Sequence, residues 1–124
     1  MGSAYPLAGC SILVVEDEPL IALEMATLFQ SAGAQVVSVR TCAEARVAIE
    51  QRSVCAAVLD YRLGDDNVGT LCARLAERQM PFMFYSGYDD LEESFPKSLI
   101  VQKPATGNAL ISAITGLVSP AADA

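Results

Sequence analysis

The sequence contains no histidine, and this absence removes several kinds of site at once. Its four cysteines, Cys10, Cys42, Cys55 and Cys72, are spaced singly, and no C-x-x-C pair occurs among them. A zinc centre needs cysteine or histidine ligands at characteristic spacings, so the sequence argues against one. We interpret the four cysteines as small buried thiols in a reducing cytoplasm.

Basic residues are scarce as well. Eight lysines and arginines against 15 acidic residues give a formal net charge of −7 at pH 7. Nucleic-acid binding depends on basic side chains that neutralise phosphates, so we expect no nucleic-acid partner. No hydrophobic run approaches the roughly 20 residues that cross a membrane, and residues 7–10 (LAGC), which resemble a lipid-attachment box, follow no readable signal region. We therefore expect a cytoplasmic protein with no membrane partner.

The 124 residues, of which 52% are hydrophobic, are enough for one domain with a real core. Short runs rich in valine, isoleucine, leucine and phenylalanine alternate along the chain with stretches of helical pattern. We predict one domain over residues 11–118, with flexible termini at 1–10 and 119–124. The runs predict five buried strands, at residues 12–16, 35–39, 55–60, 81–86 and 98–102.

The stretches between these runs predict helices. Pro19 opens the first, and Thr41 with Glu44 forms a capping box at the start of the second. Residues 87–98 leave room for about two helical turns, so the helix there should be short or irregular. The other predicted helices cover residues 19–32, 42–51, 68–79 and 106–118.

Five strands that alternate with helices predict an α/β fold with a parallel sheet and right-handed crossovers. The common arrangement for five strands is flavodoxin-like and doubly wound, with strand order 2-1-3-4-5. In that order the first and third strands are neighbours. The switch point between them is where such sheets bind ligands, outside the carboxyl ends of the strands.

Polar residues stand at these carboxyl ends. Glu16 and Asp17 end the first strand, Asp60 ends the third, Ser86 ends the fourth, and Lys103 follows the fifth. The three carboxylates should therefore converge, and converging carboxylates either share a proton or hold a cation. Oxygen ligands without histidine or cysteine favour Mg²⁺ over zinc.

Four short segments carry a resemblance to a known family. They are VVEDE at 14–18, VLDYRL at 58–63, FYSGY at 84–88 and QKPA at 102–105. Together they resemble the conserved boxes of bacterial two-component response regulator receiver domains, and the likeness extends over about residues 11–118.

The resemblance implies a magnesium-dependent phosphoryl carrier in a phosphorelay. Asp60 matches the aspartate that takes a phosphoryl group from a sensor histidine kinase or a histidine phosphotransfer protein. Ser86 matches the residue that bonds a phosphoryl oxygen, and Lys103 matches the lysine that pairs with the phosphoryl group. The implied magnesium ligands are Glu16, Asp17, Asp60 and the backbone carbonyl of Arg62.

Such a domain is not an enzyme beyond its own phosphorylation and autodephosphorylation, and it signals through contact with an unknown protein target. Alternatively it drains phosphoryl groups from a shared kinase. A haloacid-dehalogenase-type phosphohydrolase also uses a strand-end aspartyl phosphate, but it needs a second aspartate where this chain has Arg62. A flavodoxin-like cofactor binder would need a glycine-rich phosphate loop, which is missing. Each of three residues also has a purely structural alternative: Asp17 caps a helix, Ser86 is a turn residue and Lys103 is a solvated surface lysine.

The chain departs from most receivers in two respects. Ile100 stands where most have an aromatic switch residue, and residues 87–98 are short for the fourth helix. Both features, with the box at 84–88, resemble an alphaproteobacterial single-domain subgroup with an F-x-T-G-Y box, here with serine for threonine. In that case Tyr88 is the candidate moving aromatic. Arg62 and Tyr88 are also large residues beside the expected path of the hydrolytic water, which predicts slow autodephosphorylation.

Overall fold

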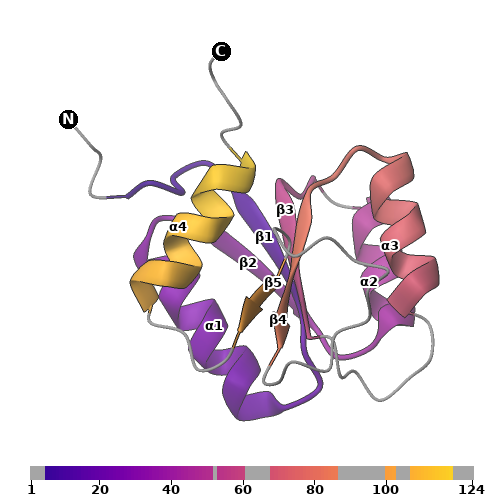
Figure 1. Cartoon of the computed structure of the whole chain (residues 1–124), viewed down its shortest axis with the longest axis horizontal. Coiled ribbons are helices and arrows are strands. Elements are labelled where there is room, and N and C mark those ends of the chain that lie inside the picture. Colours follow the sequence, from indigo (N-terminus) through magenta and orange to yellow (C-terminus); the bar gives the residue numbers. More distant parts are fainter. Residues whose placement is uncertain (1–4, 52, 61–67, 87–99, 103–106, 119–124) are drawn as a thin grey trace.

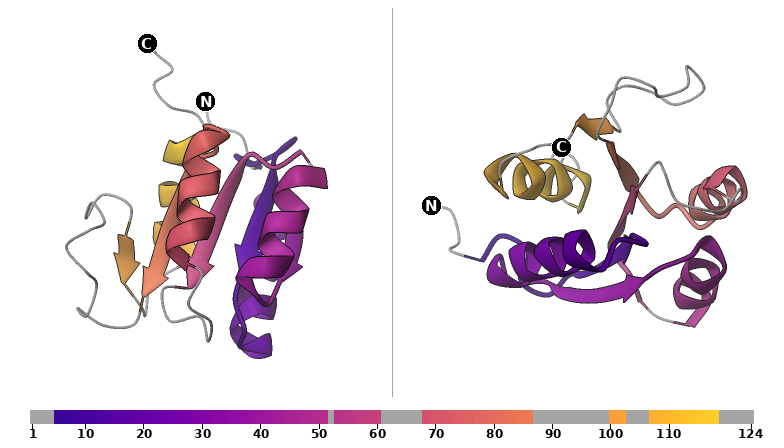
Figure 2. Two further views of the ribbon diagram at one scale, coloured as in Figure 1. Left: turned by 90° about the vertical axis from the view of Figure 1, so that its right-hand side faces the viewer. Right: turned by 90° about the horizontal axis from the view of Figure 1, so that it is seen from below.

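The computed structural model describes residues 5–51, 53–60, 68–86, 100–102 and 107–118. Five parallel strands form one sheet with the order β2-β1-β3-β4-β5, which confirms the predicted topology (Figure 1). All strand arrows point the same way, so their carboxyl ends meet at one edge (Figure 2). The strands are β1 Ser11–Val15, β2 Gln35–Val39, β3 Ala56–Asp60, β4 Phe82–Ser86 and β5 Ile100–Gln102.

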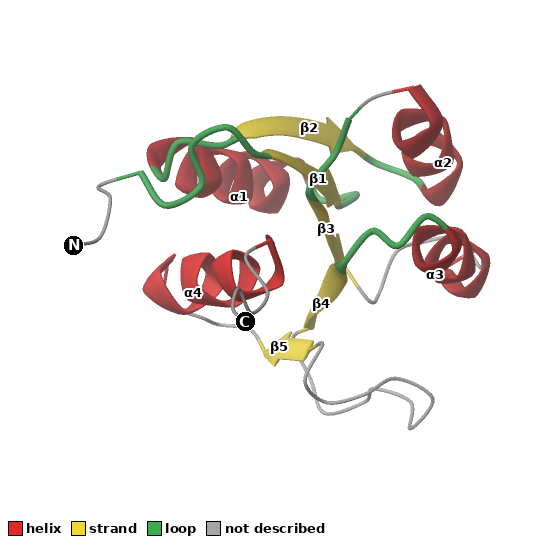
Figure 3. Ribbon diagram, turned by 90° about the horizontal axis from the view of Figure 1, so that it is seen from above, coloured by secondary structure: helices red, strands yellow, loops and turns green. Residues whose placement is uncertain are grey.

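Helices cover both faces of the sheet, as a doubly wound fold requires. Two of them, α1 and α4, lie on one face, and α2 and α3 lie on the other (Figure 3). The short helix expected within residues 87–98 falls outside the described residues. Within the described part of the chain, no helix is both long enough and apolar enough to span a membrane. The helices are α1 Pro19–Ser31, α2 Cys42–Gln51, α3 Val68–Glu77 and α4 Gly107–Val118.

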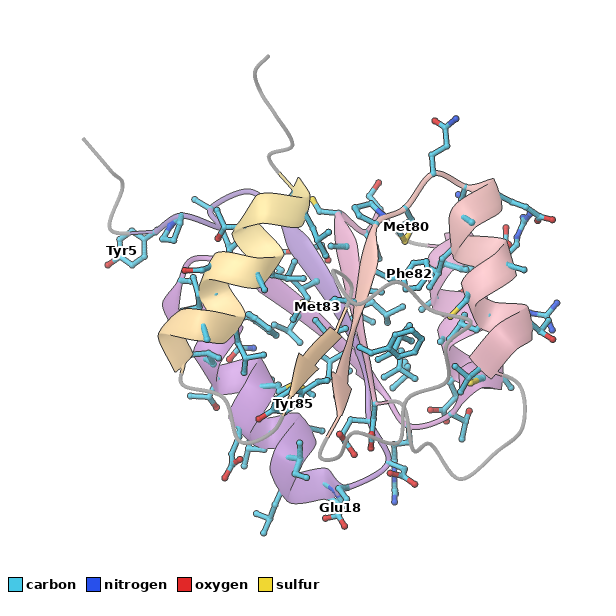
Figure 4. The ribbon with its side chains drawn as sticks, viewed as in Figure 1. Tyr5, Glu18, Met80, Phe82, Met83 and Tyr85 are labelled. Atoms are coloured by element: carbon cyan, nitrogen blue, oxygen red, sulfur yellow. The ribbon has the colours of Figure 1, made fainter. Side chains whose placement is uncertain are left out.

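The strands alternate between two cores, because successive side chains of a strand point to opposite faces. In β1, Leu13 and Val15 join the core beneath α2 and α3, whereas Ile12 and Val14 join the core beneath α1 and α4. β3 follows the same alternation and is buried along its whole length. In β4, Phe82 turns to the α3 side, and Met83 and Tyr85 turn to the other (Figure 4).

Local signals in the sequence account for the helix starts. Pro19 is the first residue of α1, where its missing N–H costs nothing. At α2, the hydroxyl of Thr41 accepts the N–H of Glu44 at 3.1 Å, as the capping box predicts. The return bond differs, because the Glu44 carboxylate accepts the N–H of Arg40 at 2.8 Å, one residue earlier than the usual pattern.

The N-terminal segment differs from the expectation of a flexible end at residues 1–10. Residues 5–10 form a turn that packs on the domain, and Leu7 is fully buried there. The N–H of Leu7 donates to the carbonyl of Ala32 at 2.8 Å. Gly33 has φ +100°, and a Cβ there would lie 2.8 Å from that of Tyr5. Burial of one leucine is worth roughly 1.5–3 kcal/mol, which explains why this part of the segment is held in place.

Candidate functional site

Three acidic residues meet where β1 and β3 end. Asp60 is the last residue of β3, and Glu16 and Asp17 follow β1 directly. The two strands are paired with Val15 opposite Leu59, so their next residues lie side by side. One carboxylate oxygen from each of Glu16, Asp17 and Asp60 lies within 4.8 Å of the others. The structure thus brings together the three carboxylates that we predicted to converge from their positions at the ends of strands.

These carboxylates are partly shielded from water. Glu16 has none of its surface exposed and Asp60 has 5%, while Asp17 is half-buried. At an effective dielectric constant of about 20, two full negative charges about 5 Å apart repel by roughly 3 kcal/mol. Such a cluster needs a bound cation or a shared proton to offset the repulsion.

Backbone and side-chain bonds fix the segment that carries two of the acids. The N–H of Glu16 donates to the carbonyl of Val39 at 3.0 Å, which extends the pairing of β1 with β2. The carboxylate of Glu16 accepts the N–H of Glu18 at 3.0 Å, and the guanidinium of Arg40 donates to the carbonyl of Asp17 at 3.3 Å. The turn between β1 and α1 is therefore fixed by the side chain of Glu16 within it and by the side chain of Arg40, which follows β2.

The geometry bears on the alternative in which Asp17 only caps α1. The N-cap residue of α1 is Glu18, and its side chain makes no capping hydrogen bond to the helix. Asp17 instead contributes a carboxylate oxygen to the cluster with Glu16 and Asp60. The chemistry of the donor set fits a hard divalent cation, because all three side chains offer oxygen and none offers nitrogen or sulfur.

Ser86 is the last residue of β4 and lies at the same edge of the sheet. Asp60 pairs with Tyr85, so Ser86 stands one position beyond the partner of Asp60. Ile100 is the first residue of β5 and pairs with Phe84. The structure describes only the backbone of Ser86 and Ile100. Three more of the predicted site and switch residues lie outside the described part of the chain: Arg62, Tyr88 and Lys103.

One residue near the site was not among the predictions. Arg40 follows the last residue of β2, next to β1, and its guanidinium reaches the turn that carries Asp17. The signal was present in the sequence, since Arg40 directly follows the predicted strand 35–39 at the edge where ligands were expected. The guanidinium of Arg40 places a positive charge at the backbone carbonyl of Asp17.

The chain belongs to the response regulator receiver domain family, whose model matches residues 12–115. Receiver domains of this family act in two-component phosphorelay signalling, and this is the class of protein that the fold and the acidic cluster define.

Its relatives include regulators of several bacteria. Over 111 residues the chain is 32% identical to the phyllosphere-induced regulator PhyR of Methylorubrum extorquens, covering 82% of this chain and 42% of PhyR. The chain thus spans less than half of that relative. Among solved structures, a receiver protein of Sinorhizobium medicae matches with a TM-score of 0.78 at 29% identity, covering 90% of this chain and 95% of that one. SdrG of Sphingomonas melonis matches with a TM-score of 0.76 at 31% identity, covering 94% and 99%.

Proposed function

We propose that Asp60 accepts a phosphoryl group from a sensor histidine kinase or a histidine phosphotransfer protein, in a step that depends on Mg²⁺. The observation that carries the proposal is the convergence of the carboxylates of Glu16, Asp17 and Asp60 within 4.8 Å. Membership of the receiver family supports the reaction class, and the position of Asp60 at the end of β3 supports its role.

In this proposal Glu16, Asp17, Asp60 and the backbone carbonyl of Arg62 hold the cation. Mg²⁺ supplies charge neutralisation, so that a carboxylate and an anionic phosphoryl group can approach each other. The chain's own residues do the positioning, which is most of what phosphoryl transfer requires. The carboxylate of Asp60 is the nucleophile, and the turn fixed by Glu16 and Arg40 keeps Asp17 beside it.

Two residues are assigned to the phosphoryl group after transfer. The hydroxyl of Ser86 donates a hydrogen bond to one phosphoryl oxygen, and the ammonium group of Lys103 pairs with another. Ser86 is the last residue of β4, at the edge of the sheet that carries Asp60, and Lys103 comes directly after the last residue of β5 in the sequence. In phosphoryl transfer, positive charges and hydrogen-bond donors accelerate the reaction because they stabilise the negative charge on the phosphoryl oxygens in the transition state.

The exposed face of α1 supports docking of the phosphodonor there. Leu20 and Leu23 are 71% and 62% exposed and stand three residues apart on one side of the helix. α1 starts next to the acidic cluster, because its N-cap residue Glu18, labelled in Figure 4, directly follows Asp17. A downstream protein target would bind elsewhere, on the side of β5 and α4. If the chain only drains phosphoryl groups from a shared kinase, it needs the docking surface for the phosphodonor and no surface for a downstream target.

Labelling by acetyl phosphate tests the proposal. With Mg²⁺ present, the intact protein should gain one phosphoryl group per chain, and Asp60→Asn or addition of EDTA should abolish the gain. Glu24→Gln, an exposed change on α1, is the matched control and should label normally. Full labelling of Asp60→Asn would overturn the proposal, and catalytic turnover of a phosphomonoester would favour a phosphohydrolase.

A further inference from the structure

Two cysteines far apart in the sequence lie at the start of neighbouring strands. Cys10 directly precedes β1, and Cys55 directly precedes β3. The N–H of Cys55 donates to the carbonyl of Ser11 at 2.7 Å, and Ile12 is aligned with Ala56. Cys10 is therefore one position away from the residue opposite Cys55. In regular parallel strands, Cα atoms related in this way are about 6 Å apart, inside the range of about 4.4–6.8 Å that disulfides span.

The two thiols also lie close enough to influence each other. In a regular sheet, residues offset by one position point to opposite faces, but Cys55 lies in a bend before β3 begins. Burial raises the pKa of the Cys10 thiol, and the neighbouring Cys55 side chain raises it further. Both residues are partly exposed, whereas Cys42 and Cys72 are buried in the core. Backbone proximity and solvent access therefore coincide at this pair.

We propose that Cys10 and Cys55 are a redox-active dithiol, which low-molecular-weight disulfides oxidise reversibly to an intramolecular disulfide. This site is separate from the phosphoacceptor, because it lies where β1 and β3 begin and the acids lie where they end. Disulfides in reducing compartments are mostly transient and regulatory, and a partly exposed pair of neighbouring thiols has the features of such a bond.

The oxidation proceeds by two thiol–disulfide exchanges. The thiolate of one cysteine attacks a sulfur of the small disulfide, forms a mixed disulfide and releases one small thiol. The second cysteine then attacks the protein sulfur of the mixed disulfide and releases the second small thiol. The two protein thiols lose two electrons and two protons, and the small disulfide gains them.

The order of attack follows from the surroundings of Cys10. Burial and the neighbouring Cys55 side chain raise the pKa of the Cys10 thiol. The thiolate is the attacking species, so Cys55 reacts first and Cys10 closes the bond. The Cys10→Ser variant should therefore stop at a mixed disulfide on Cys55, and Cys55→Ser should react more slowly through Cys10.

Treatment of the full-length chain with glutathione disulfide tests the inference. The number of thiols titrated after denaturation should fall from four to two, and the intact mass should fall by two hydrogens without an attached glutathione. Peptide mapping without reductant should recover one peptide pair that links Cys10 and Cys55, and dithiothreitol should restore all four thiols. Cys72→Ala, which leaves the pair intact, is the control and should form the same link.

Three results would overturn the inference. The first is stable glutathione adducts on both residues with no linked peptide. The second is a link that involves Cys42 or Cys72. The third is loss of two thiols in Cys10→Ser to the same extent as in the unchanged protein, since that variant has no partner for Cys55.

Discussion

The buried carboxylate of Glu16 accepts the backbone N–H of Glu18 at 3.0 Å, so the same side chain that joins the acidic cluster also shapes the turn into α1. Its charge and its role as an acceptor are separable, because glutamine keeps an oxygen that can accept this bond. Glu16→Gln should therefore keep the fold and still weaken Mg²⁺ binding by about tenfold or more. Isothermal titration with Mg²⁺ measures this, and an unchanged affinity would contradict a place for Glu16 in the metal site.

The repulsion within the cluster leads to a prediction whose sign depends on the metal. In EDTA, Asp17→Asn removes one of three close negative charges, so it should raise the free energy of unfolding by about 1 kcal/mol. In millimolar Mg²⁺ the same variant should lose most of the stabilisation that the unchanged protein gains, because a cation that binds only the folded state stabilises it. Urea denaturation with and without Mg²⁺ measures both, with Glu24→Gln as control. Equal stabilisation of Asp17→Asn by Mg²⁺ would count against a metal at this site.

The N-terminal turn should contribute to stability. Leu7 is fully buried, and Leu7→Ala should lower the free energy of unfolding by about 2–4 kcal/mol. Tyr5→Ala is the matched control, because Tyr5 is 59% exposed, and it should change the free energy by less than about 1 kcal/mol. Urea denaturation distinguishes the two. If both variants unfold like the unchanged protein, the turn does not pack on the domain in solution.

The ion pairs that link Glu50 of α2 to Arg74 of α3 and to Arg78 just beyond it should make a small pH-dependent contribution to stability. Glu50 accepts hydrogen bonds from Arg74 at 2.5 Å and from Arg78 at 3.1 Å. The bond from Arg74 is the main reason that the pKa of Glu50 lies below its ordinary value of 4.5. A depressed pKa means that the pairs stabilise the fold above that ordinary value and that this contribution disappears as the pH falls through the lowered pKa.

Glu50→Gln should therefore lower the thermal midpoint slightly at pH 7, and the difference should shrink as the pH falls below 4.5. High salt should also shrink the difference, because the groups are exposed and screened. Calorimetry across this pH range measures it. Glu77→Gln, which removes only the outer partner of Arg74, is the control and should have a smaller effect. A difference that persists at low pH would show that packing, and not charge, is responsible.

Slow loss of the phosphoryl group is predicted from the residues two positions beyond Asp60 and two beyond Ser86. Arg62 and Tyr88 are both large, and together they should hinder the hydrolytic water. The double substitution Arg62→Ala with Tyr88→Ala should shorten the acyl-phosphate lifetime several-fold, measured by decay of the labelled protein after removal of the donor. Arg46→Ala, on the exposed face of α2, is the control. An unchanged lifetime in the double variant would refute the idea.

The sheet was predictable because its physics is local and periodic. Runs such as residues 55–60 are hydrophobic at nearly every position, which is typical of a strand buried on both faces, and β3 is buried in this way. The convergence of Glu16 and Asp60 then followed from strand order alone, since neighbouring parallel strands end at one edge.

The features that sequence reasoning missed depend on register and on non-periodic segments. Leu7 lies in a turn without repeating pattern, and its burial in the core beside α1 is visible only in the structure. Cys10 and Cys55 were read as isolated thiols, because 45 positions separate them along the chain. Their proximity needs the pairing of β1 with β3 and the bend before β3, and spacing in the sequence reports neither.

A parallel strand has a direction, and β1 and β3 carry different chemistry at their two ends. Thiols stand where both strands begin and carboxylates stand where both finish. Five extended residues separate the two ends by about 17 Å, which is farther than either set of side chains can reach. The same two strands thus carry the proposed dithiol at one end and the proposed phosphoacceptor site at the other. A substitution at one of these sites should leave the other site unchanged.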